Sequence, residues 1–223
     1  MRIFTSFLLL IAFHLSYSQT TQSSGITRVQ NISELNLALK SVVPGDTIQM
    51  ENGVWKDSEI EIKASGTKEL PIVIMAQEKG KVFLEGQSNL KIGGNYLIVD
   101  GLYFRNGHTP SGSVVQFKVD NDHIANNSTL TNCVIEDYTQ LSRETQDHWI
   151  EFWGRNNTME YCYLAGKSNS GPTLRVYLKG NENINTHHNI TNNYFGPRPR
   201  KGGPHAETMQ IGSSETSMTP AYV

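Results

Sequence analysis

Residues 189–195, NITNNYF, contain a five-residue segment, 191–195 (TNNYF), that the chain has already used three times. The earlier copies are 100–104 (DGLYF), 131–135 (TNCVI) and 160–164 (EYCYL). The last residues of successive copies are 31, 29 and 31 positions apart. Such a near-constant period, built from short strands and Asn/Gly turns, is typical of a solenoid. Because no convincing helix follows the first strand, the sequence predicts an all-β fold, a right-handed parallel β-helix.

The two cysteines follow the same register. Cys133 and Cys162 each precede the last apolar residue of their segment by two positions, so they should stack on neighbouring coils about 4.8 Å apart. A disulfide fits that spacing and a secreted protein would allow one, but adjacent parallel strands rarely offer the required torsion. We favour two buried thiols over a disulfide. Asn132 and Asn192 also share a register, which predicts an asparagine ladder at a turn.

The N-terminal residues 1–18 have the pattern of a secretory signal. Arg2 precedes an apolar run at 3–15, and Ser16 and Ser18 are the small residues that a signal peptidase requires. A run of 13 residues is short of the roughly 20 that a membrane-spanning helix needs. The pattern predicts a secreted or periplasmic protein cleaved after Ser18, without a membrane span. An uncleaved tether is the alternative.

The rest of the chain is predicted to be a polar linker, 19–25, and one β-helical domain, 26–223. The domain opens with a short amphipathic helix for which Ser33 is the predicted N-cap. Its apolar face is formed by residues spaced three or four apart: Ile32, Leu35, Leu39 and Val42. The Pro-Gly-Asp sequence at 44–46 ends the helix, which is expected to cap the open end of the β-helix.

The composition and net charge indicate the class of protein. The chain is 37% hydrophobic and 18% charged, as in ordinary soluble globular proteins, and its net charge of −2 argues against a nucleic-acid binder. A local cluster departs from that charge: Arg198, Arg200, Lys201 and His205 lie on a loop rich in Pro and Gly. This cluster predicts a site for an acidic ligand, although a solvated charged loop remains the alternative.

The segment 147–153, DHWIEFW, is a candidate wall for an elongated binding surface. Strand alternation places Trp149, Glu151 and Trp153 on one face, where exposed indoles would stack on sugar rings. The alternative is that one of the two tryptophans belongs to the core. Arg175 lies on a later strand and faces opposite to its apolar neighbours, towards solvent.

Three motifs together resemble a known family. They are 171–181 (GPTLRVYLKGN), 192–199 (NNYFGPRP) and 202–212 (GGPHAETMQIG), and they are similar to polysaccharide lyase family 6, the alginate lyases and chondroitinase B. The sequences PGDTI at 44–48 and ENGVW at 51–55 are similar too. The resemblance extends over nearly the whole predicted β-helix.

The resemblance implies β-elimination on a uronic-acid polymer, alginate first. The C5 proton is acidic enough to remove only when the adjacent carboxylate is neutralised; a base then takes it and an acid protonates the leaving oxygen. In the family, as the resemblance implies, these groups are a lysine, an arginine and a calcium ion. The lysine and arginine follow the ETMQIG strand by at least one coil. Catalytic residues are therefore expected beyond Val223, and the chain alone is expected to be inactive.

The resemblance also implies substrate contacts and one metal ligand. The substrate-binding candidates are Arg175, Arg198, Arg200, Lys201, His205, Gln210, Trp149 and Trp153. Glu207 is the candidate metal ligand, but residues 204–206 (PHA) lack the asparagine that binds calcium in the family. A calcium site and a calcium-independent site, in which His205 shares the neutralising role, both stay open.

Other classes remain to be weighed. The segment 219–223 provides no closing helix or polar cap, so 26–223 is predicted to be the N-terminal part of a longer, monomeric protein. A glycoside hydrolase would need paired carboxylates, for which Asp120 and Asp122 are the candidates, in a segment that has a loop composition. The main rival is a non-catalytic β-helix protein that binds acidic glycans.

Overall fold

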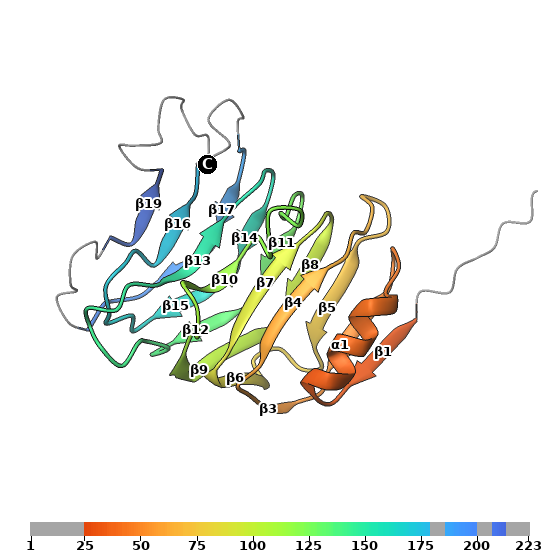
Figure 1. Cartoon of the computed structure of the whole chain (residues 1–223), viewed down its shortest axis with the longest axis horizontal. Helices are drawn as coiled ribbons and strands as arrows, with labels where there is room; N and C mark the ends of the chain where they lie inside the picture. Colours follow the sequence, from red (N-terminus) through yellow and green to blue (C-terminus); the bar gives the residue numbers. More distant parts are fainter. Residues whose placement is uncertain (1–24, 179–185, 200–206, 213–223) are drawn as a thin grey trace, which may run out of the picture.

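The computed structural model describes residues 25–178, 186–199 and 207–212. The strands form three parallel sheets, and the chain passes through sheets A, B and C in that order once per coil (Figure 1). Sheet A contains β1 (Ile26–Val29), β2 (Thr47–Met50), β5 (Ile72–Ala76), β8 (Leu97–Asp100), β11 (Thr129–Thr131), β14 (Thr158–Glu160) and β17 (Asn189–Thr191). Sheet B contains β3 (Gly53–Lys56), β6 (Val82–Gln87), β9 (Leu102–His108), β12 (Val134–Glu136), β15 (Tyr163–Ala165) and β18 (Tyr194–Phe195). Sheet C contains β4 (Glu59–Lys63), β7 (Asn89–Gly93), β10 (Ser113–Gln116), β13 (His148–Phe152), β16 (Leu174–Val176) and β19 (Met209–Ile211). The predicted parallel β-helix is confirmed.

The repeated segments mark the corner between sheets A and B. Their second residues, Gly101, Asn132, Tyr161 and Asn192, all have positive φ, between 52° and 83°. Glycine tolerates this conformation without cost, and asparagine visits it more readily than most residues. The repeat is therefore a strand, a left-handed turn residue and a second strand, and Asn132 and Asn192 share the predicted position.

The interior is filled by columns of side chains that repeat at every coil. In sheet A, the register aligns one such column: Ile48, Ile74, Val99, Leu130, Met159 and Ile190. Another column contains aromatic rings. The centroids of the Phe117 and Phe152 rings are 4.5 Å apart, and the His188 ring centroid lies 4.7 Å from that of Phe152. Burying a large apolar side chain stabilises the fold by roughly 1.5–3 kcal/mol, so each coil depends on its neighbours.

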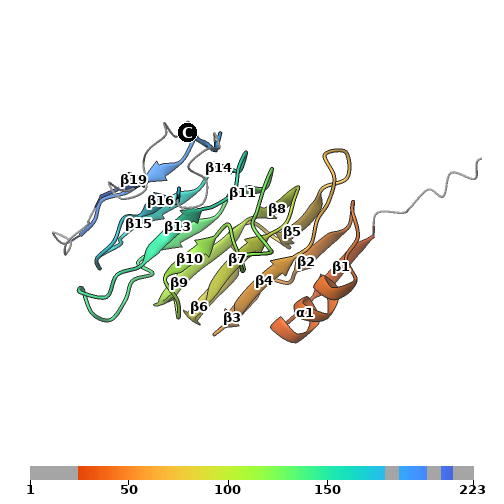
Figure 2. The ribbon, with the colours of Figure 1, turned by 45° about the horizontal axis from the view of Figure 1, so that its top comes forward.

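The single helix of the described residues, α1 (Ile32–Ser41), covers the N-terminal end of the β-helix (Figures 1 and 2). It contacts β1, β2 and β4, as expected of a cap. The predicted N-cap, Ser33, is wrong. Asn31 is the cap: its side chain accepts from Glu34 N at 3.0 Å, while the Glu34 carboxylate accepts from Gln30 N at 2.9 Å. A reciprocal cap needs an acidic residue three positions after the cap, and Asn31 has it.

Cys133 and Cys162 are both buried and free, which confirms the prediction of two thiols. Each sulfur lies 3.3 Å from a carbonyl oxygen two residues earlier in the chain. Burial raises the pKa of the Cys133 thiol well above its ordinary value. Both side chains are buried, so the two cysteines are core residues of the folded protein.

Several sequence predictions fall outside the described residues. These are the signal, 1–18, most of the linker, and the cationic residues Arg200, Lys201 and His205. Within the described part of the chain, no helix has the length and apolar character needed to cross a membrane.

Candidate functional site

The outward side of sheet C carries a row of polar side chains that we call the sheet C face. The strand register aligns one member per coil: Glu61, Lys91, Gln116, Glu151, Arg175 and Gln210. Neighbouring strands lie about 4.8 Å apart, so this row extends along the long axis of the molecule. The arrangement suits an elongated polar ligand.

Trp153 lies just after β13, next to this row. Its ring stacks on Tyr177 with centroids 3.9 Å apart, and Lys118 Nζ lies 3.9 Å from the Trp153 ring centroid. Lys118 and Tyr177 belong to the coils on either side, so Trp153 is held between them. It is partly exposed, and its predicted contact with a sugar ring stays a prediction.

Trp149 is buried, contrary to the prediction that its indole is exposed. Alternation places it on the same side as Glu151, but it is 0% exposed and its indole N–H donates to Tyr138 O at 2.8 Å. Tyr138 belongs to the segment between β12 and β13, which covers this end of the strand. The prediction that Trp149 contacts substrate is therefore wrong, and the alternative that one of the two tryptophans is core holds.

Glu151 is a largely buried carboxylate at the centre of the sheet C face. It accepts hydrogen bonds from Ser113 Oγ at 2.5 Å and from Trp153 Nε1 at 2.7 Å. His148 Nδ1 lies 3.6 Å from Glu151 Oε2, the oxygen that accepts from Ser113. Burial lowers the pKa of His148, and the positive charge of Arg175 lowers it further, against the opposing effect of Glu151. His148 is therefore neutral near pH 7.

Arg175 faces outward as predicted and is partly exposed. It lies in register between Glu151 and Gln210, and its guanidinium carbon is 4.8 Å from the Tyr177 ring centroid. Its Nε is buried and has no hydrogen-bond partner among the residues that the structure describes. Arg175 thus places a fixed positive charge on the sheet C face, with Gln210 one coil further on.

Arg198 has a structural contact that the sequence did not predict. It donates from Nη2 to Asn169 O at 2.6 Å and from Nη1 to Gly171 O at 3.1 Å and to Thr173 Oγ1 at 3.4 Å. Burial lowers its pKa from the ordinary value. The guanidinium thus fastens the segment after β18 to the segment before β16, and a contact with substrate stays a prediction.

Glu207 lies two residues before β19, and its carbonyl oxygen accepts from Thr173 N at 3.1 Å. Among the described residues, no group of three or more His, Cys, Asp or Glu side chains is arranged to hold a metal ion. Glu207 as a metal ligand stays a prediction, and we derive no catalytic step through calcium.

The sequence did not single out Lys91, Ser113, Gln116 or His148. The coils that carry them differ in length, so these residues do not recur at a fixed spacing, and only strand pairing aligns them with Glu151 and Arg175. An alternating strand pattern was the only available signal, and it does not say which residues of different coils are neighbours.

Comparisons with known proteins identify the family. The family model described as Chondroitinase B matches residues 29–223. The chain is 40% identical to the family 6 polysaccharide lyase AlyGC, an alginate lyase, with a TM-score of 0.84 over 89% of this chain and 27% of that one. It is 34% identical to the family 6 lyase Pedsa3628 from Pseudopedobacter saltans, with a TM-score of 0.72 over 87% and 43%. No curated protein gives a significant match.

A third solved structure is a mannuronic-acid-specific family 6 lyase from human gut microbiota, at 26% identity and a TM-score of 0.80 over 88% of this chain and 46% of that one. The chain spans between about a quarter and about half of the length of these three proteins. The family match nevertheless covers nearly all of the chain. The chain belongs to the chondroitinase B family, within polysaccharide lyase family 6.

Proposed function

We propose that this chain is part of a secreted or periplasmic, monomeric polysaccharide lyase that cleaves a uronic-acid polymer, foremost alginate, by β-elimination. The observation that carries the proposal is the 40% identity to an alginate lyase over 89% of this chain. The sheet C face supports it, because a row of polar side chains along several coils suits an extended polymer.

In this proposal, Arg175 binds a carboxylate of the polymer. A guanidinium offers paired N–H donors that match a carboxylate, and its charge offsets the negative charge that develops when the C5 proton leaves. Gln210 lies in register beside it and offers an amide to sugar hydroxyls. The two residues therefore bind and orient the sugar unit whose carboxylate is being neutralised.

Glu151 has a positioning role. Its hydrogen bond from Trp153 Nε1 fixes the indole, and the indole in turn holds Tyr177 beside Arg175. We assign the catalytic base and acid to no described residue and place them on coils that lie beyond this chain. The described residues then act as the binding part of the site.

The experiment is to follow ultraviolet absorbance of the unsaturated uronate that β-elimination leaves behind. Polymannuronate, polyguluronate and dermatan sulfate are each incubated with this chain and with the protein extended at its C-terminus, with and without a chelator. We expect product only from the extended protein, and loss of product with the chelator would identify a metal requirement.

Two outcomes would contradict the proposal. Activity of this chain alone would mean that the base and acid lie within it. Binding of acidic polymers without any unsaturated product from either protein would favour a non-catalytic glycan-binding protein.

A further inference from the structure

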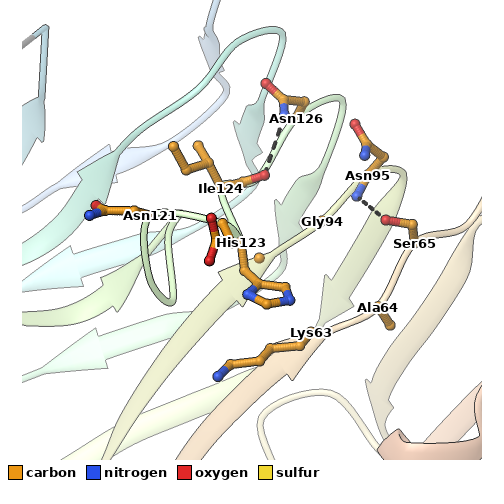
Figure 3. A pocket seen from close by; sticks show the side chains of 11 residues that line it. Lys63, Ala64, Ser65, Gly94, Asn95, Asn121, His123, Ile124 and Asn126 are labelled. Atoms are coloured by element: carbon orange, nitrogen blue, oxygen red, sulfur yellow. Dashed lines mark hydrogen bonds between the residues drawn. The ribbon is translucent and has the colours of Figure 1, made fainter. Parts of the chain in front are cut away.

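A pocket of about 450 Å³ lies beside the N-terminal part of the sheet C face (Figure 3). It opens between the end of β4 and the loop that follows β10, where the chain turns from sheet C to sheet A. Its lining is mostly charged, amide and hydroxyl side chains: Lys63, Ser65, Asn95, Asn121, Asp122, His123 and Asn126. Sites for apolar ligands are lined mainly by apolar groups, so this pocket suits a strongly polar one.

Two glycines allow the pocket walls to approach each other. A Cβ on Gly93 would lie 2.7 Å from His123 O, and a Cβ on Gly94, which has a φ of +140°, would lie 1.8 Å from Ala64 O. A larger residue at 93 would therefore displace the loop after β10, and one at 94 would displace the residues that follow β4. The sequence GG at 93–94 thus keeps His123 and Lys63 on the same pocket (Figure 3).

Asp120 holds the side chains of His123 and Lys63 in place. Its carboxylate accepts from His123 Nδ1 at 2.7 Å and pairs with Lys63 Nζ at 3.1 Å, and these contacts keep the pKa of Asp120 below its ordinary value. Lys63 Nζ also lies 3.7 Å from Glu61 Oε2. An ammonium group has three donors, so these two pairings leave Lys63 one donor for a ligand. The pocket therefore combines the ammonium group of Lys63 with several neutral amide groups and one carboxylate, that of Asp122.

The pocket is connected to the sheet C face through Lys118. Lys118 Nζ donates to Asn121 Oδ1 at 2.9 Å and lies 3.9 Å from the Trp153 ring centroid. Lys63 and Trp153 belong to coils three strand spacings apart, which is about 14 Å along the long axis. A polymer extended over the sheet C face would reach the pocket.

Cations recur along this path. They come from β4, β7, the end of β10 and β16, and are Lys63, Lys91, Lys118 and Arg175. The carboxylates of Glu61 and Glu151 lie among these cations, and Glu61 pairs with Lys91 at 2.9 Å. A polyuronate carries one carboxylate on each sugar unit, so cations on four coils offer partners to carboxylates of several sugar units. These cations extend the binding surface from Arg175 to the pocket.

We propose that the pocket is a distal subsite that binds one sugar unit of the acidic polymer, with Lys63 on its carboxylate and Asn95 and Asn121 on its hydroxyls. The inference rests on the proposed function, because it takes the polymer to be a polyuronate. It adds a second point of attachment, remote from Arg175, that only a polymer long enough to reach both positions can use.

The test is isothermal titration calorimetry of this chain with polyuronate oligosaccharides of increasing length. Lys63→Gln and Asn121→Ala are compared with the unaltered chain, while absorbance is monitored for cleavage. We expect both substitutions to weaken binding of long oligosaccharides, by about tenfold for Lys63→Gln, and to leave short ones unaffected. The His123 ring resonances should shift with long oligosaccharides only.

Lys79→Gln is the matched control. Lys79 pairs with Asp100 at 3.3 Å, is exposed, and lies between β5 and β6, away from the sheet C face. Ion pairs between exposed side chains contribute little to stability, so both lysine variants should fold. The control should bind all oligosaccharides as the unaltered chain does, which separates a local contact from a change in net charge.

The outcomes distinguish the subsite from the function. If the unaltered chain binds polyuronates but the pocket variants behave like Lys79→Gln, or lose affinity equally for short and long oligosaccharides, the subsite is overturned and the proposed function survives. If the unaltered chain binds no polyuronate of any length, both are overturned.

Discussion

The outward faces of sheets B and C are built by the same backbone rule but carry opposite chemistry. On sheet C the register aligns charged and amide side chains around Glu151 and Arg175. On sheet B it aligns apolar and aromatic ones: Val54, Phe83, Tyr103, Val134, Tyr163 and Tyr194. The sides of both sheets that face the interior are mostly apolar, so the backbone does not distinguish the two faces.

Side chains of the sheet B row find their contacts within sheet B. Tyr163 and Tyr194 stack with centroids 4.9 Å apart and an interplanar angle of 13°, and the Arg105 guanidinium lies 3.5 Å from the Phe83 ring centroid. The Tyr103 hydroxyl donates to Glu136, which raises the pKa of Tyr103 to about 12. On sheet C, by contrast, Arg175 Nε has no partner among the described residues. The difference supports our proposal that sheet C is the binding face and sheet B a structural one.

The largest expected effect concerns the corner where the two faces meet. Lys167 follows β15 of sheet B, and Asp147 precedes β13 of sheet C; Nζ lies 2.5 Å from Oδ1, and the side chains are 1% and 0% exposed. Burial lowers the pKa of Lys167, against the opposing effect of Asp147. Lys167→Met leaves Asp147 charged and buried, so we expect the free energy of unfolding to fall by about 3–5 kcal/mol in denaturant titrations.

The double variant Lys167→Met with Asp147→Leu is the control for this prediction. It removes both charges and should recover most of the lost stability, because the cost comes from the unpaired carboxylate. A double variant as unstable as Lys167→Met would show that packing, and not charge, decides the corner between sheets B and C.

The next effect concerns the interior behind the two faces. Burial lowers the pKa of His188 to about 4 from the ordinary value of 6.5, so between these values the unfolded chain binds a proton that the folded chain does not. The free energy of unfolding is therefore at its full value above pH 6.5. It falls by up to about 3 kcal/mol as the pH decreases from 6.5 to about 4. Denaturant titrations across the window should show a smaller decrease for His188→Phe, and equal decreases would contradict the assignment.

The direct comparison of the two faces uses one substitution on each. Arg175→Ala on sheet C should weaken binding of polyuronate oligosaccharides by roughly thirtyfold, which corresponds to about 2 kcal/mol for a charged hydrogen bond. Tyr163→Ala on sheet B should leave the affinity unchanged, although Tyr163 is 39% exposed. Calorimetry of both variants measures the difference, and a similar loss in the two would abolish the distinction between the faces.

The smallest effect lies at the corner between sheets A and B. Tyr161 has a φ of +54° and is 59% exposed, at a position that other coils fill with Gly or Asn. Tyr161→Asn should therefore raise the free energy of unfolding by about 0.5–1 kcal/mol. Thermal unfolding measures the change, with Asn132→Ala as a control that should shift the midpoint downward.

The sequence predicts the fold because its signals are local. A left-handed turn residue between two short strands recurs at Gly101, Asn132, Tyr161 and Asn192, and the period of that pattern specifies a solenoid. Strand alternation likewise predicts that Arg175 faces outward. The buried thiols follow from the same register.

Only the tertiary structure decides which residues share a site and which are covered. Trp149 and Trp153 have the same parity, yet the segment before β13 buries one and leaves the other partly exposed. Arg198 fastens its segment to backbone carbonyls of the previous coil, and Lys118 joins the pocket at Lys63 to the sheet C face. These contacts depend on coils of unequal length and on the loops between them, because the pairing of strands, and not the spacing along the chain, sets which side chains become neighbours.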